Sequence, residues 1–173
     1  PAVADAVRNI PLIAAGGVVD GRTAAAAFAL GADAVCVGTR LVASRESLAS
    51  DEYKRRILAA RNDETTVTTI FGPEWPDAPM RVIRNRAVAR AERGESPPLG
   101  PVGETIVFGQ RYAMPACSAV LPTRDTLGDH DEMCIAAGAG VGAVDAVQPA
   151  ADIVTELMRD ARRVLKHVAP SSW

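Results

Sequence analysis

The chain has 173 residues, 48% hydrophobic and 23% charged, a composition typical of one ordinary globular domain and not of a disordered or fibrous chain. Its net charge of −2 creates no field that would attract nucleic acid, and no apolar run approaches the roughly 20 residues that a transmembrane helix needs. We therefore expect a cytoplasmic protein with neither nucleic-acid nor membrane partners, and the sequence leaves its oligomeric state open.

The beginning of the chain indicates a piece of a longer protein. Residues 1–9 have no initiator Met and read as the closing turns of a helix whose start is absent. A short apolar run follows at residues 10–15 and ends in Gly16-Gly17, which is typical of a strand buried on both faces of a parallel sheet.

A helix and a second strand come next. Asp20 is placed to cap a helix over residues 21–30, and Gly31 is placed to end it. Residues 34–37 predict another buried strand, in which Cys36 would be a small core residue. Gly38-Thr39 then turns the chain into a helix that starts near Arg40, so the segment predicts a βαβα unit with two adjacent parallel strands.

Beyond residue 50 the pattern changes. Residues 51–61 predict an amphipathic helix with Tyr53, Ile57 and Leu58 on one face and with Lys54, Arg55 and Arg56 largely on the others. Later segments predict, in order, a strand or an extended edge segment (65–70), a Pro-rich loop (72–79), a basic helix (80–93), a connector (95–103), an irregular stretch (104–132) and a Gly-rich segment (136–144). A final helix over residues 149–168 carries an apolar stripe of Ile153, Val154, Leu157, Met158, Ala161, Val164 and Leu165.

The cysteines and histidines do not form a recognisable site. Cys36, Cys117 and Cys134 are far apart and lack CxxC spacing, so we expect neither a disulfide framework nor a metal site. His167 ends a surface helix and His130 lies in a polar loop, so we assign no catalytic role to either.

The two glycine turns are the candidate ligand-binding site. A phosphate group needs several converging backbone N–H groups, which favours turns without bulky Cβ atoms. Gly16, Gly17 and Gly38 meet that demand at the ends of neighbouring strands, and Thr39 adds a hydroxyl donor. The side chain of Arg40 could reach the phosphate or point to the outer helix layer. Two alternatives are tight turns that bind no ligand and another kind of phosphate-binding barrel.

Residues 10–44 (IPLIAAGGVVDGRTAAAAFALGADAVCVGTRLVAS) resemble a segment that nitronate monooxygenases share with flavin-dependent enoyl-acyl-carrier-protein reductases. The likeness continues through residues 51–72, RVIRN at 81–85 and residues 137–161, although Ala139 stands where that family often has Gln and the WPDAP stretch is longer than usual. The resemblance implies an α/β fold: the last two βα units of a (β/α)₈ TIM barrel in residues 1–50, with a mostly helical tail in residues 51–173 that packs on the barrel. It also implies that Gly16, Gly17, Gly38 and Thr39 bind the phosphate of FMN.

By the same resemblance, the activity is oxidation of an alkyl nitronate with O2 to a carbonyl compound and nitrite, with the catalytic His upstream of Pro1. Three alternatives stay open. The parent protein could be an enoyl-acyl-carrier-protein reductase; this chain alone could be inactive; or it could be a truncated remnant that acts at most as an interaction module.

Overall fold

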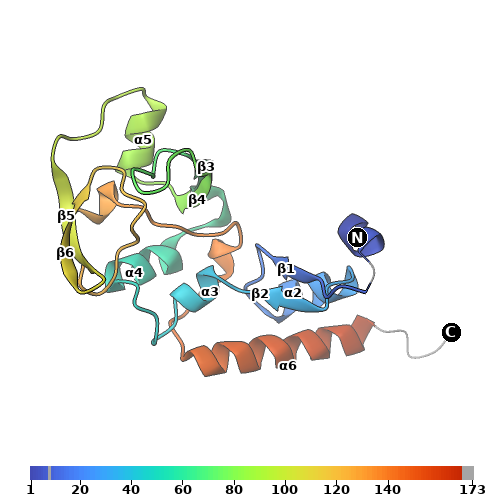
Figure 1. Cartoon of the computed structure of the whole chain (residues 1–173). Helices are drawn as coiled ribbons and strands as arrows, with labels where there is room; N and C mark the ends of the chain where they lie inside the picture. The colour runs from blue at the N-terminus through green and yellow to red at the C-terminus, as the bar shows by residue number, and fades with distance from the viewer. Residues whose placement is uncertain (8, 169–173) are drawn as a thin grey trace.

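The computed structural model describes residues 1–7 and 9–168 and has an α/β fold (Figure 1). The first part contains α1 (Ala2–Ala6), β1 (Ile13–Ala15), α2 (Gly21–Ala29), β2 (Ala34–Cys36) and α3 (Thr39–Val42). The second contains α4 (Asp51–Ala59), η1 (Asn62–Glu64), β3 (Thr65–Thr68), β4 (Met80–Ile83), α5 (Arg86–Glu92), β5 (Pro101–Val107), β6 (Gln110–Pro115), β7 (Leu127–Gly128), η2 (His130–Glu132), η3 (Val141–Ala143) and α6 (Ala150–Val168).

The predicted βαβα unit is confirmed. Strands β1 and β2 pair in parallel, with Ile13 opposite Ala34 and Ala15 opposite Cys36, and α2 connects them. The Asp20 carboxylate accepts the Thr23 N–H at 2.8 Å, and the Thr23 hydroxyl oxygen accepts the Asp20 N–H at 3.0 Å. This reciprocal pair satisfies N–H groups that have no partner within the first turn of a helix, so α2 begins where the sequence predicts.

We expect Asp20→Ala to lower the free energy of unfolding by about 1 kcal/mol, because an N-cap carboxylate is lost. Urea denaturation followed by circular dichroism measures this change. Asp20→Asn keeps a side-chain oxygen acceptor and should stay close to the wild type. Equal losses in the two variants would contradict the capping role.

The prediction that both strands are buried on both faces is wrong. Val35 packs on the cluster formed by α2 and α6, but Ile13, Ala15 and Cys36 are exposed. The reason is that these helices cover one face of the β1–β2 pair, and nothing else within residues 1–7 and 9–168 buries the other. Cys36 is therefore not the core residue that its apolar neighbours predict.

Helix α6 runs alongside α2 and beneath the β1–β2 pair in Figure 1. At their crossing a Cβ on Gly21 would lie 2.4 Å from the Cβ of Asp160 and 2.6 Å from the Ala161 nitrogen, so only glycine fits there. The predicted stripe is mostly confirmed: Ile153, Leu157 and Ala161 are buried, and Met158, Val164 and Leu165 pack beside that cluster. Val154 departs from it and is 53% exposed.

The prediction of a mostly helical tail is wrong, because strands β3 to β7 all lie in it. The predicted basic helix over residues 80–93 is in fact two elements: β4, which pairs antiparallel with β3, and α5, which starts only after Asn85. The Asn85 side chain accepts the Val88 N–H at 3.1 Å and donates to the Met133 carbonyl at 2.8 Å. The start of the helix is thus set by this cap.

The stretch predicted to be irregular, residues 104–132, holds most of a three-stranded antiparallel sheet in the order β6-β5-β7. Phe108 and Gly109 both have positive φ angles, 49° and 76°, which is the backbone of a two-residue type I′ hairpin turn. This turn reverses the chain between β5 and β6, and the β5 strand takes up the end of the predicted 95–103 connector.

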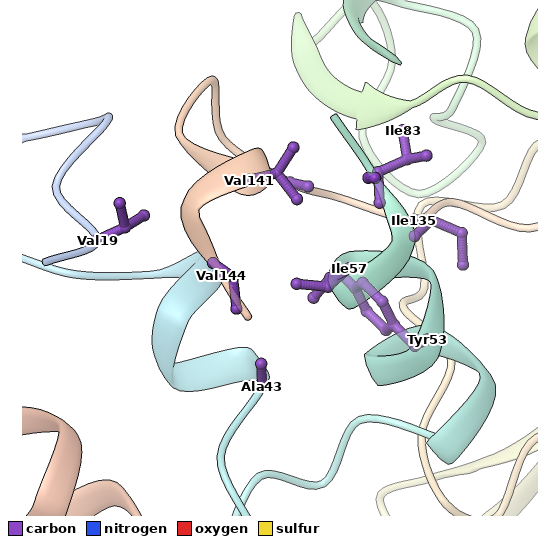
Figure 2. Packing of buried hydrophobic residues seen from close by; sticks show 10 residues of the cluster. Val19, Ala43, Tyr53, Ile57, Ile83, Ile135, Val141 and Val144 are labelled. Carbon is purple, nitrogen blue, oxygen red and sulfur yellow. The ribbon is translucent and has the colours of Figure 1, made fainter. Parts of the chain in front are cut away.

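The largest core cluster joins both parts of the chain. Figure 2 shows Val19 and Ala43 from the first part on the same cluster as residues of the tail. Its buried members are Val19, Ala43, Tyr53, Ile57, Ala60, Ile83, Ile135, Ala137, Val141 and Val144. The helix predicted over residues 51–61 is confirmed as α4, except that Lys54 is buried, with its ammonium donating to the Ser47 carbonyl at 3.1 Å. The division into barrel units in residues 1–50 and a tail in residues 51–173 that packs on the barrel stays a prediction.

Candidate functional site

The two predicted turns lie at the same end of the β1–β2 pair. Because the strands are parallel and Ala15 stands opposite Cys36, Gly16-Gly17 and Gly38-Thr39 both follow the carboxyl ends of neighbouring strands. This edge is where open and barrel-shaped α/β folds place their ligands. The structure therefore brings together all four residues that the sequence singles out.

The turns offer donors and room. Cβ atoms built on Gly16, Gly17 or Gly38 would meet no other atom within 4 Å, so the space beside each of them is open. The Gly16 N–H lies at the end of the β1–β2 ladder, and no turn or loop hydrogen bond within residues 1–7 and 9–168 uses the N–H of Gly17, Gly38 or Thr39. Backbone N–H groups beside such open space, without bulky side chains around them, suit an anion with several acceptor oxygens such as a phosphate.

Thr39 links the second turn to a distant segment. Its hydroxyl oxygen accepts the N–H of Gly138 at 2.8 Å, across 99 positions of sequence. Because a hydroxyl group can accept and donate at the same time, its hydrogen stays free for a ligand. The bond to Gly138 fixes where the hydroxyl oxygen lies.

The Gly-rich segment also touches the first turn. A Cβ on Gly140 would lie 3.1 Å from the Gly17 carbonyl oxygen and 3.1 Å from the Val19 side chain. Gly138 and Gly140 thus contact one turn each, and the exposed Ala139 lies between them. Sequence reasoning did not place these residues in the site; the closely spaced glycines in residues 136–144 were the signal available.

Arg40 has another function. Its side chain is buried, and its guanidinium donates to the Ala146 carbonyl at 2.9 Å and to the Gln148 side chain. These bonds commit it to the segment that precedes α6, which favours the outward orientation over a phosphate contact.

The histidines lie elsewhere in the structure. The His130 ring is 3.0 Å from the hydroxyl of Ser50, the N-cap residue of α4, and His167 is exposed in the last turn of α6. In the described part of the chain no three His, Cys, Asp or Glu side chains come together as metal ligands would. Over the same residues, no helix has the length and apolar character required to cross a bilayer.

The comparisons with known proteins identify the family of this chain. The family model for nitronate monooxygenase matches residues 1–160. Nitronate monooxygenase npaC of Metarhizium robertsii is 36% identical over 180 residues, covering 97% of this chain and 46% of its own length. A 5-hydroxy-7a-methyl-1-oxo-octahydro-1H-indene-4-carboxyl-CoA dehydrogenase of Mycobacterium tuberculosis is 45% identical over 96 residues, covering 54% of this chain and 26% of its own length.

A solved structure matches nearly the whole fold. FabK from Thermotoga maritima superposes with a TM-score of 0.68 at 28% identity, covering 96% of this chain and 49% of that one. The chain thus spans less than half the length of each of these relatives. The family model spans the two turns, the tail strands and part of α6, and on that basis the chain belongs to the nitronate monooxygenase family.

Proposed function

We propose that this chain is the C-terminal part of an FMN-dependent oxidoreductase that oxidises alkyl nitronates with O2 to a carbonyl compound and nitrite. In this proposal β1, α2, β2 and α3 are the last two βα units of a (β/α)₈ barrel. Gly16, Gly17, Gly38 and Thr39 hold the phosphate of FMN, and the flavin supplies the redox chemistry. The observation that carries the proposal is that Gly17, Gly38 and Thr39 have no turn or loop bond at their N–H groups, at the edge of the sheet where open space lies beside Gly16, Gly17 and Gly38.

In this proposal the residues of this chain bind and orient the FMN phosphate, and we assign no catalytic group among them. A catalytic His upstream of Pro1 stays a prediction. Three charge-assisted hydrogen bonds at roughly 1.5–3 kcal/mol each supply about 4.5–9 kcal/mol. Association costs on the order of 4–15 kcal/mol, so the phosphate contacts alone give weak binding. We therefore expect tight FMN binding to need further contacts to the flavin ring, and residues 1–173 alone to be inactive.

Thr39 gives a direct test of the phosphate site. Thr39→Val keeps the size of the side chain but removes the hydroxyl, so we expect the FMN dissociation constant to rise about 10-fold, the value of one charge-assisted bond. Thr39→Ser keeps the hydroxyl and should bind FMN nearly as the wild type does. Flavin-fluorescence titration measures both constants, and riboflavin, which lacks the phosphate, should bind all three proteins equally.

A second candidate is a flavin-dependent reductase or dehydrogenase of an acyl thioester, including the enoyl-acyl-carrier-protein reductase. The 45% identity to a carboxyl-CoA dehydrogenase over 96 residues supports this second candidate. Oxygen uptake and nitrite release with a nitronate would support the first proposal. NAD(P)H oxidation with an enoyl thioester, without nitronate turnover, would support the second.

The inactive-remnant alternative has a separate test. The visible absorbance of the purified protein reports bound flavin directly. Stoichiometric yellow flavin would exclude a remnant that binds none, whereas no uptake of added FMN, even weakly and at high FMN concentration, would contradict the flavin site. A cytoplasmic location stays a prediction.

A further inference from the structure

The Gly-rich segment that contacts both turns is held in place by side chains from the tail. The Tyr53 hydroxyl, on α4, donates to the Ala136 carbonyl at 2.6 Å. The Asn62 side-chain oxygen, in η1, accepts the Gly142 N–H at 2.8 Å. These two bonds lie on either side of Gly138 and Gly140, so they fix both ends of the stretch that meets the turns.

The surroundings of the Tyr53 and Asn62 side chains fix the geometry of both hydrogen bonds. Tyr53 is 1% exposed and belongs to the buried cluster that also contains Ile135, Val141 and Val144, and Figure 2 shows its ring beside Ile57. Burial raises the pKa of the Tyr53 hydroxyl, which therefore remains a donor. At the other end, a Cβ on Gly142 would lie 2.8 Å from the Asn62 nitrogen, so the segment approaches η1 as closely as its backbone allows.

The segment also offers donors of its own. Within residues 1–7 and 9–168 no hydrogen bond uses the N–H of Ala139 or Gly140, and Ala139 is exposed. A shift of this stretch would move the Gly138 N–H away from the Thr39 hydroxyl and would loosen the Gly140 contact with Gly17. The geometry of the two turns thus depends on where the segment is held.

We propose that Tyr53 and Asn62 are positioning residues: they hold residues 136–142 against the two glycine turns and thereby set the affinity of the site for a phosphate group, without touching the ligand. This inference deepens the proposed function and rests on it. It adds α4 and η1, elements outside the βαβα unit, to the parts of the chain that determine phosphate binding.

The test uses Asn62, because its side chain is exposed and its replacement does not disturb the core. Asn62→Ala removes the acceptor, whereas Asn62→Asp keeps an oxygen in its place. We expect Asn62→Ala to speed amide hydrogen exchange across residues 136–144 and to raise the FMN dissociation constant about 3- to 10-fold, the effect of one weakened hydrogen bond. Asn62→Asp should restore both values, and riboflavin binding should stay unchanged.

Tyr53→Phe is the second variant, since it keeps the ring and removes only the hydroxyl. It should act in the same direction on exchange and on FMN affinity. Faster exchange with unchanged FMN affinity would overturn the inference, as would unchanged exchange in both variants. A wild-type protein that binds no flavin would instead contradict the proposed function, and the exchange measurement would still decide whether the two side chains hold the segment.

Discussion

Gly17→Val should weaken FMN binding by about 10- to 100-fold, the loss of one or two charge-assisted hydrogen bonds. Gly17 has a φ of +70°, in the left-handed region, where a β-branched residue is strained. A valine there would shift the turn and fill the open space in which the proposed phosphate lies. Fluorescence titration of the purified protein with FMN measures the change.

The same substitution at Gly94 is a matched control. Gly94 has a φ of +71°, open space around it and a place in the loop after α5, so Gly94→Val carries a similar conformational cost. Both variants should lose about 1–2 kcal/mol of unfolding free energy. Only Gly17→Val should lose FMN affinity. An equal loss of affinity at the two positions would show that destabilisation, and not a phosphate contact, explains the effect.

Glu132→Gln should lower the free energy of unfolding by about 3 kcal/mol, because it removes the carboxylate from a largely buried ion pair. The Glu132 side chain is 6% exposed and accepts hydrogen bonds from Arg90 at 2.5 Å and from Arg86 at 2.6 Å. The value is at the low end of the usual range because the Arg86 side chain is 49% exposed and can return to water. Urea denaturation at neutral pH measures it.

The effect should also depend on pH. The hydrogen bonds from Arg90, and then from Arg86, lower the pKa of Glu132 below its ordinary value. The carboxylate therefore contributes its full stability above a pH of about 4.3, the ordinary pKa of a glutamate. That contribution is lost as the pH falls through the lowered pKa of the folded protein. The difference between wild type and variant should shrink in that range.

Glu104 provides the control for this prediction. Its carboxylate lies 3.3 Å from the Arg111 guanidinium in a pair whose side chains are 43% and 80% exposed. Exposed pairs of this kind contribute less than about 1 kcal/mol, so Glu104→Gln should change stability little at any pH. If the Glu132 variant were no less stable than the Glu104 variant, the assigned role of the ion network would be wrong.

Local signals predicted the first part of the chain well, because Asp20 and Gly31 mark the ends of α2 within a few residues. They failed where distant segments pair. Val82 and Ile83 look helical in a short window, yet they pair with Thr66 and Thr65 of β3. The Asn85 cap was a local sign of the true helix start that the prediction did not use.

The hairpin between β5 and β6 and the contact of the Gly-rich segment with the turns could not be predicted, for related reasons. The turn between β5 and β6 has Phe108 in a left-handed conformation that Asn or Asp usually adopts, so its sequence lacks the common hairpin signature. Gly138 meets Thr39 across 99 positions, and only the folded chain reveals that contact. The four turn residues could be chosen from the sequence because adjacent parallel strands necessarily end at one edge.

The close crossing of α2 and α6 has a mechanical consequence. At Gly21 and Asp160 the two main chains meet with no side chain between them, so we expect α2 and α6 to shift together at this point. Helix α2 starts four residues after Gly17, and any tilt of α6 is therefore passed to that loop. Helix α6, although remote in sequence, therefore influences the geometry of the first turn.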